Sequence, residues 1–359
     1  MSRTIRLLDL GEVAPLRSQT VYHTAAYALT EDSPDTIILV SPQTPYVCIG
    51  YHQDLEKEVD LAYCREHGLP VYRREVGGGA VYLDRGQIFT QWAFHRDRLP
   101  AALEARFDLY IRPLVETYRA LGIEAYHRPI NDIHVAGKKI GGTGAAQMGV
   151  AEVVVGSLML TFDKATMAKV LKVPSEKMRD KIFESLEQYM TTIQEQLGQL
   201  PPRQEVKDLY VQKCRQILGV EIVPGAWTEE EESLAAELDA RFASEEWLFQ
   251  QGRLRQPGVK IHSDVQVVEK AFKAPGGLIR VVARLREGRI DDLSLSGDFT
   301  LLPSFALGAL EQAVRGLSAR RDSLTARLQE AYQRLGIQSP GVTPADFATA
   351  ILAAADAQG

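Results

Sequence analysis

The chain has 359 residues, of which 45% are hydrophobic and 25% charged, a composition typical of a globular protein. Its length predicts about two domains and excludes a peptide or a one-layer module. With 41 Lys and Arg against 47 Asp and Glu, the net charge is -6, which argues against broad electrostatic binding of nucleic acid.

The cysteines and the N-terminus indicate the compartment. Cys48, Cys64 and Cys214 lack the close spacings of a disulfide framework or a zinc site. The N-terminus has no apolar core of signal-peptide length, and no stretch approaches the roughly 18 apolar residues of a membrane span. We therefore expect a cytoplasmic protein with neither a membrane nor a nucleic acid as partner.

The first part of the chain alternates short β-branched runs with helical patterns. Strands are expected at 5–9, 36–41, 46–50, 71–74, 80–82, 88–94, 132–135 and 153–162, and helices at 17–29, 55–67 and 103–121. Several strands follow one another through short turns, which favours hairpins over a parallel sheet. We expect a mixed, largely antiparallel sheet with these helices on one face.

From residue 163 the pattern becomes helical, and it returns to strands near residue 245. Helices are expected at 164–171, 184–197, 203–218 and 229–242; strand character returns at 245–257, with strands at 261–272, 278–285 and 290–295, and helices follow at 303–317, 320–335 and 344–359. This order predicts an α+β fold with a large domain at 1–245, a small α+β domain at 246–337 and a helical tail at 338–359. The hinge is expected near 244–257.

The first chemically informative segment is RREVGGGAVYLD at 73–84. Three consecutive glycines suit a sharp turn or a close approach to a ligand, and the N–H groups of such a turn can cradle a phosphate. Arg73 and Arg74 precede the turn, and because strand neighbours point to opposite faces, only one is expected to reach the ligand. A tight hairpin with solvated arginines is the alternative.

The second segment is NDIHVAGKKIGGTG at 131–144, a short strand, a glycine turn and a return strand that begins at Lys139. A lysine on a rigid strand can neutralise a carboxylate and a neighbouring phosphoryl oxygen. Asp132 could hold Mg²⁺, which prefers carboxylate and phosphate oxygens. Exposed turn lysines are an equally good explanation of this segment alone.

Together the two segments resemble the motifs of the lipoate-protein ligases, and the resemblance runs from about residue 47 to residue 162. Residues 279–317, with Ser296-Gly297-Asp298-Phe299, resemble the accessory C-terminal domain of such ligases. The resemblance implies a biotin/lipoate ligase-like catalytic domain. It implies that ATP and lipoate form lipoyl-AMP and pyrophosphate, and that the lipoyl group passes to a lysine of an acceptor protein.

The resemblance also implies the site residues. Lys139 would be catalytic and would touch the lipoyl carbonyl and the α-phosphate, and Asp132 would lie near Mg²⁺. The expected binding residues for ATP and lipoyl-AMP are Arg74, Gly77, Gly78, Gly79, Ala80, Val81, Tyr82, Asn131, Asp132, Lys139 and Gly142. The acceptor would be a lipoyl domain, a protein like the glycine-cleavage H protein, or a lipoate-binding protein of sulfur metabolism.

Three departures from the family pattern leave the acyl group and the acceptor open. Val155 stands where many relatives have a histidine, Gln87 where an Asn is common, and the segment after Asp180 lacks a basic, serine-rich sequence. The acid could therefore be lipoate or octanoate.

Three alternatives remain. An octanoyl or lipoyl transferase would take a pre-activated acyl group through a cysteine, but residues 127–130, just ahead of the second motif, contain none. A biotin ligase would be expected to have a different glycine-rich arginine loop. A non-catalytic lipoate or adenylate binder is possible because fold does not guarantee function. The retention of Arg74, the triple glycine and Lys139 together argues against it, as does a second domain, which a binder would not need.

Overall fold

The computed structural model describes residues 4–250, 265–286 and 288–355. The chain forms two compact units. Unit 1 comprises Met1–Cys48, Val59–Arg74 and Val81–Trp247, and unit 2 comprises Ile49–Glu58, Glu75–Ala80 and Leu248–Gly359. Two short segments of the N-terminal half, one of which contains the triple glycine, therefore group with the C-terminal unit.

Unit 1 contains an eight-stranded sheet in the order β11-β1-β2-β6-β10-β9-β8-β7. Its strands are β1 (Thr4–Val13), β2 (Thr36–Pro42), β6 (Gln87–His95), β7 (Tyr126–Arg128), β8 (Asp132–Val135), β9 (Lys138–Met148), β10 (Ala151–Met159) and β11 (Glu221–Pro224). The pairs β1–β11 and β1–β2 are parallel and the other pairs are antiparallel. The expected mixed, largely antiparallel sheet is confirmed.

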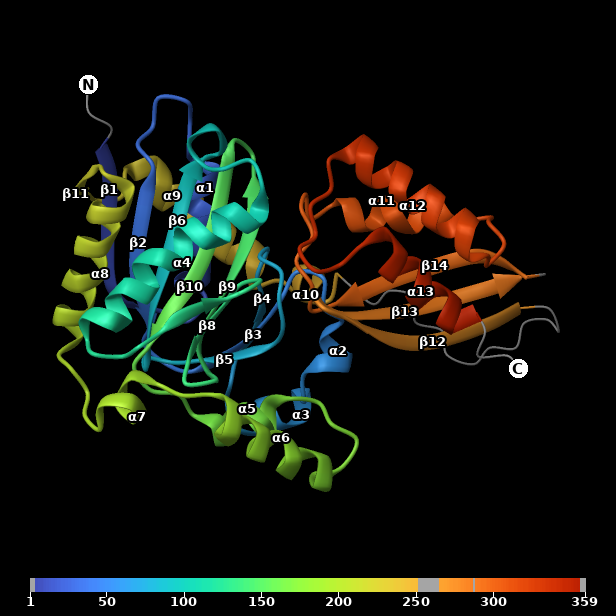
Figure 1. Ribbon diagram of the computed structural model, residues 1–359, viewed down its shortest axis with the longest axis horizontal. Coiled ribbons are helices and arrows are strands. Elements are labelled where there is room, and N and C mark those ends of the chain that lie inside the picture. Colours follow the sequence, from blue (N-terminus) through green and yellow to red (C-terminus); the bar gives the residue numbers. More distant parts are fainter. Residues whose placement is uncertain (1–3, 251–264, 287, 356–359) are drawn as a thin grey trace. The chain divides into compact units, whose positions relative to one another are not determined.

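Helices cover both faces of this sheet, so the expectation of a single covered face is wrong. In β6, Thr90 bonds the hydroxyl of Tyr110 in α4 (Leu103–Ala120), and Trp92 donates to Tyr210 in α8 (Arg203–Leu218). Gln91, between them, donates to the Ser18 carbonyl of α1 (Arg17–Tyr27). Because alternate strand residues face opposite sides, α1 lies opposite α4 and α8 (Figure 1).

A second, three-stranded sheet in unit 1 has the order β4-β3-β5. It contains β3 (Tyr46–Ile49), β4 (Val71–Arg73) and β5 (Val81–Leu83). The helix expected at 55–67 is divided into α2 (Leu55–Glu58) and α3 (Leu61–Glu66). The division has a local cause, since Asp60 caps α3 by accepting from the Tyr63 N–H, and Val59 forms a bridge with Leu171.

The helical segment of unit 1 contains α5 (Lys164–Val170), α6 (Glu176–Tyr189), α7 (Ile193–Leu197), α8 and α9 (Glu229–Phe242). Helices α8 and α9 have the expected bounds. The single helix expected at 184–197 is two helices, because Thr192 caps a new helix by accepting from Glu195 N. None of the side chains of α6 is buried.

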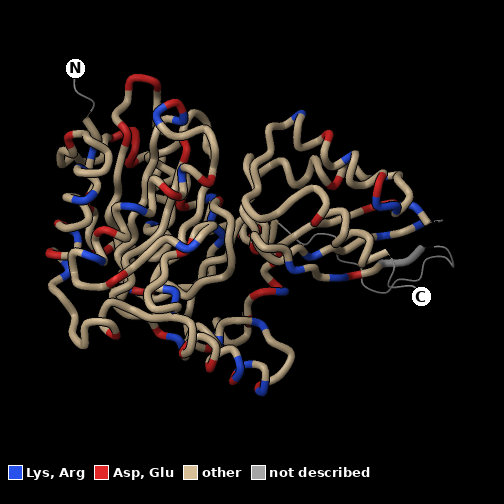
Figure 2. Tube along the Cα trace, viewed as in Figure 1, with Lys and Arg blue, Asp and Glu red and all other residues tan. Residues whose placement is uncertain are grey.

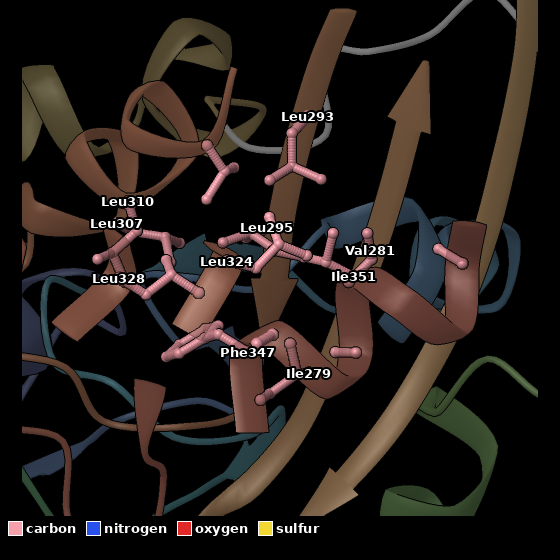
Figure 3. Packing of buried hydrophobic residues seen from close by; sticks show 14 of the residues in the cluster. Ile279, Val281, Leu293, Leu295, Leu307, Leu310, Leu324, Leu328, Phe347 and Ile351 are labelled. Carbon is pink, nitrogen blue, oxygen red and sulfur yellow. The ribbon is translucent and has the colours of Figure 1, made fainter. Parts of the chain in front are cut away.

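Unit 2 contains the meander β12 (Val265–Ala274), β13 (Gly277–Arg286) and β14 (Arg289–Gly297). Three helices, α11 (Ala306–Val314), α12 (Arg321–Leu335) and α13 (Pro344–Ala355), pack on it. Figure 3 shows their shared core, in which Leu295 of β14, Leu310 of α11 and Phe347 of α13 are fully buried. The residues expected to form a separate helical tail thus contribute α13 to this core.

The expected strand character at 245–257 is wrong for its first part. Residues Glu245–Leu248 form a short helix, α10. The Trp247 indole of α10 donates to the Arg73 carbonyl at 2.8 Å, and its ring packs against Phe242 with centroids 4.5 Å apart. Residues 251–257 and the start of the strand expected at 261–272 lie outside the described residues.

Charged residues of both signs are distributed along the whole described trace (Figure 2). Along the described trace, acidic and basic residues alternate over both units without a long basic stretch (Figure 2). Within the ranges that the structure describes, no helix is long and apolar enough to cross a membrane.

Candidate functional site

The second motif forms a tight hairpin between β8 and β9. Ala136 and Gly137, at the turn, both have positive φ, 47° and 80°, as expected for the two central residues of a type I′ turn. Lys138 pairs with Val135, and Lys139 pairs with His134. The hairpin is thus formed by residues close together in sequence, and it delivers Lys139 from a paired strand.

Four predicted site residues of this hairpin lie together. The Lys139 Nζ atom is 2.7 Å from Asp132 Oδ1, and the two side chains are 38% and 30% exposed. A Cβ atom on Gly142 would lie 3.0 Å from the Lys139 Nζ, so the glycine leaves room for the ammonium group. Asn131 is held to Thr143 by backbone and side-chain hydrogen bonds. The result is a partly open ammonium and carboxylate pair on a fixed hairpin.

His134 belongs to the same cluster, although it was not among the predicted site residues. Its ring is 4% exposed, and its Nε2 lies 3.4 Å from Arg128 and 3.9 Å from Asp132 Oδ2. Burial, followed by the charge of Arg128, lowers the pKa of His134. The signal that could have found it is strand alternation, since His134 and Asp132 are two residues apart and share a face.

One carboxylate of this cluster, Asp132, is of the kind that magnesium sites use, and its Oδ1 is paired with Lys139. Among the described residues no group of three or more His, Cys, Asp or Glu side chains is placed to hold a metal ion. Mg²⁺ in nucleotide sites commonly takes one or two carboxylates, and phosphate and water complete the shell. Asp132, partly exposed and beside Asn131, provides such a carboxylate.

The two arginines of the first motif are both buried in unit 1. Arg73 is 0% exposed and Arg74 9%. Arg74 donates to the Cys48 carbonyl at 3.3 Å. Buried guanidinium groups are rare unless they are paired, so the alternative of solvated hairpin arginines does not describe them.

The three glycines of the first motif belong to unit 2, where each has different surroundings. Gly78 has a φ of 101°, and a Cβ on Gly50 would collide with the Gly78 carbonyl. A Cβ on Gly77 would lie 2.9 Å from the Phe299 carbonyl oxygen, whereas one on Gly79 would meet nothing closer than 3.8 Å. Close backbone packing inside unit 2 therefore requires glycine at positions 50 and 77, and the positive φ favours it at position 78.

Residues far along the chain hold this glycine loop. Within unit 2, the Tyr51 N–H donates to the Val76 carbonyl at 3.1 Å, and Gly297 donates to the His52 carbonyl at 3.0 Å. The rings of His52 and Phe299 stack with centroids 5.3 Å apart. The segment Ser296-Gly297-Asp298-Phe299, which resembles an accessory-domain motif, thus supports the loop that carries the triple glycine.

The remaining predicted binding residues are divided between the units. Ala80 ends a unit 2 segment, whereas Val81 and Tyr82 start β5 in unit 1 and pair with Cys48 and Val47. The Tyr82 N–H lies 3.3 Å from the sulfur of Met167. The predicted site residues therefore come from both units.

None of the three cysteines has the properties of an acyl-accepting nucleophile. Cys48, Cys64 and Cys214 are buried. Burial raises the pKa of all three thiols, to about 11 for Cys64. A reactive cysteine needs a lowered pKa and access to substrate.

The catalytic-domain model of the lipoyl protein ligase A/B family matches residues 16–215. Lipoate-protein ligase A subunit 1 of Thermoplasma acidophilum is 30% identical over 254 residues, which cover 67% of this chain and 95% of that protein. The octanoyltransferase LipM of Moorella thermoacetica is 27% identical over 272 residues, which cover 69% of this chain and 98% of the relative. Ligases and octanoyltransferases are therefore both among the relatives.

A solved structure gives the same result. The bi-partite lipoate protein ligase of T. acidophilum, described with its E2 lipoyl domain, matches with a TM-score of 0.64 and 29% identity over 72% of this chain and all of that chain. Since the family model covers more than half of the chain and the curated relative is matched over nearly its whole length, the chain belongs to the lipoyl protein ligase A/B family.

Proposed function

We propose that this protein is an ATP-dependent lipoate-protein ligase that converts lipoate to lipoyl-AMP and then lipoylates a lysine of an acceptor protein. The observation that carries the proposal is the Lys139–Asp132 pair, held at 2.7 Å on a hairpin beside Asn131 and Gly142. A solved lipoate-protein ligase A bound with ATP, 25% identical with a TM-score of 0.59, supports a nucleotide as substrate.

In this proposal, the first half-reaction depends on charge neutralisation. The carboxylate of lipoate and the phosphates of ATP repel each other, and the ammonium of Lys139 and the guanidinium of Arg74 reduce this repulsion. A carboxylate oxygen bonds to the α-phosphorus, the bond to the bridging oxygen breaks, and pyrophosphate leaves with the electron pair. Mg²⁺ bound at Asp132 would neutralise further charge on the phosphate oxygens.

The second half-reaction needs no nucleophile from this chain. The amine nitrogen of the acceptor lysine attacks the acyl carbonyl carbon, the bond from that carbon to the AMP oxygen breaks, and a proton leaves the amine. The acceptor in the proposal is a protein that carries a lipoyl-type lysine, such as a lipoyl domain. We assign adenylation to residues 1–245 and an accessory role to 246–337, with the glycine loop as the element that the accessory part supports.

The octanoyltransferase relatives make a second function worth testing. Such an enzyme would take an acyl group that is already activated and would need no ATP. The buried cysteines with raised pKa argue against an acyl-cysteine route in this chain.

The deciding experiment is acid-dependent exchange of labelled pyrophosphate into ATP with Mg²⁺ and without acceptor, in which lipoate, octanoate and biotin are compared. We expect exchange with lipoate. If the protein transfers an octanoyl group from octanoyl-loaded acyl carrier protein without ATP, and no acid supports pyrophosphate exchange, it is an octanoyltransferase. If neither reaction occurs and lipoate binds tightly, it is a non-catalytic binder.

A further inference from the structure

The strand that carries Lys139 contains a bulge one residue later. Between β8 and β9, Asp132 pairs with Gly142 and Ile133 pairs with Gly141. The next residue of β8, His134, then pairs with Lys139, so one residue of β9 is skipped. Ile140 is therefore the extra residue of β9 and has no partner in β8. Pairing of β9 with β10 extends only to Thr143 and Gly156, so β10 does not pair with Ile140 either.

The bulge determines which side chains share a face with Lys139. In a regular strand, residues three apart such as Lys139 and Gly142 point to opposite faces. One extra residue changes this alternation, and a Cβ on Gly142 would indeed lie 3.0 Å from Lys139 Nζ. Gly142 is also the partner of Asp132 in the ladder. The pairing of Lys139 with Asp132 across an open glycine thus depends on the bulge.

The backbone at the bulge is held from outside the ladder. The Thr191 N–H donates to the Lys139 carbonyl at 2.9 Å. The hydroxyl of Tyr118, in α4, donates to the Ile140 carbonyl at 3.0 Å. The same hydroxyl accepts from the Met159 N–H at 3.2 Å, at the end of β10. Tyr118 is 0% exposed, so water cannot replace its hydroxyl without rearrangement.

We propose that Tyr118 is a positioning residue, whose hydroxyl holds the Ile140 bulge and thereby keeps the Lys139 ammonium beside Asp132. The catalytic consequence rests on the proposed ligase function. Tyr118 touches neither Lys139 nor Asp132 through its hydroxyl, which bonds the Ile140 carbonyl and the Met159 N–H. It acts through the backbone.

The chain offers a matched control on the same helix. Tyr110 is also 0% exposed, and its hydroxyl donates to the Thr90 carbonyl of β6. Y118F and Y110F each remove one buried hydroxyl that joins α4 to a strand, but only Y118F affects the bulge. A purely structural role predicts the same outcome for both variants.

The kinetic test measures lipoate-dependent pyrophosphate exchange. We expect Y118F to lower kcat by about tenfold or more, as loss of a buried hydrogen bond can do, with little change in the KM for ATP. Y110F should keep kcat within about twofold. In the K139A background, Y118F should have no further effect, because residues that act as a unit are not additive. Equal losses in Y118F and Y110F, or full additivity, would overturn the proposal.

A second readout does not depend on activity. Reductive ¹³C-methylation labels the lysine amines for NMR. The signal of Lys139 is the one that K139R lacks. D132N gives the reference signal of Lys139 without its carboxylate partner. We expect Y118F to move the signal toward that of D132N and Y110F to leave it in place. If folded Y118F leaves the Lys139 signal unchanged, the positioning role is refuted. If the wild-type protein shows no lipoate-dependent pyrophosphate exchange, only the ligase function is refuted.

Discussion

The β8–β9 hairpin and the glycine loop look alike in sequence, as basic residues next to glycines, but they are stabilised in different ways. The hairpin pairs residues that are near neighbours in the chain, from Asp132 to Gly142. The glycine loop and the segment 49–58 group with unit 2, and the Arg280–Glu58 ion pair there joins residues 222 positions apart. Glycine thus serves a positive-φ turn in the hairpin, whereas in the loop it serves both a positive φ at Gly78 and close packing of Gly77 against the distant Phe299. The turn of the hairpin should therefore form with little help from distant contacts, whereas the loop should depend on them.

The largest effect is expected for K139A, which removes the ammonium group of the hairpin. Loss of such a charge stabiliser commonly lowers kcat by about 10²- to 10³-fold, while a side chain 38% exposed contributes little to folding. Pyrophosphate exchange measures the first effect and circular dichroism the second. K138A is the control, since the Lys138 ammonium lies on the same hairpin and donates to the Glu187 carbonyl at 3.4 Å; equal losses in both variants would contradict the assigned role of Lys139.

A large effect is also expected for G78V in the glycine loop. A branched side chain at a φ of 101° costs about 1–3 kcal/mol of backbone strain, and Gly50 packs directly on the Gly78 backbone. Thermal unfolding and exchange activity should both decrease. G79A is the control for thermal unfolding alone, because its Cβ would meet nothing closer than 3.8 Å and should cost little stability; an equal loss of stability in the two variants would contradict this argument.

A pH-dependent effect is expected from Glu311 in α11. Burial raises the pKa of Glu311 to about 7, although its carboxylate accepts from the Leu295 N–H. The folded state holds this proton between the ordinary glutamate pKa and about 7, so the contribution of Glu311 to stability is lost as the pH rises through that range. In E311Q the free energy of unfolding should vary less over this range, by about 1–3 kcal/mol, in urea titrations at pH 5 and pH 8. An identical pH profile for E311Q and wild type would be inconsistent with this titration.

The smallest effect is expected for K57A in the segment that groups with unit 2. The Lys57–Glu269 pair is about half exposed on both sides, and such pairs contribute about 0–1 kcal/mol. R280A, which breaks the more buried pair with Glu58 at 2.8 Å, should cost more and should reduce exchange activity through the adjacent loop. If K57A were the more damaging variant in thermal unfolding, exposure would be a poor guide to how this segment is held.

Much of the local structure was predictable from the sequence. The bounds of α8 and α9 and of β8 match the expectation, because proline and Gly219 punctuate α8, Thr228 caps α9, and β8 ends at a glycine turn. The strand β7 was missed, since Tyr126–Arg128 is too short and polar for a periodic signal. The helix α10 was mistaken for a strand, although Ser244, whose hydroxyl oxygen accepts from the Trp247 N–H, is a normal start signal.

The site was predictable to a different extent in its two parts. Asn131, Asp132, Lys139 and Gly142 lie in one short segment, so a hairpin prediction alone places them together. His134 and Tyr118 were not predicted as site residues, because an isolated histidine or tyrosine does not indicate a site until its spatial neighbours are known. The β-bulge at Ile140 has no sequence signature either, since the extra residue is identified only by the registers on both sides.

The sequence by itself determined the family, the hairpin, most helices and the candidate chemistry, because turn residues, caps and two glycine-rich motifs act over a few neighbouring positions. Only the tertiary structure decided that the triple glycine groups with the C-terminal unit, that helices cover both faces of the large sheet, and that Tyr118 reaches the backbone beside Lys139. These features depend on contacts between residues far apart in the chain. Helix and strand propensities and motif spacings do not predict such contacts, because these form only when distant segments pack together and bury their apolar and polar groups.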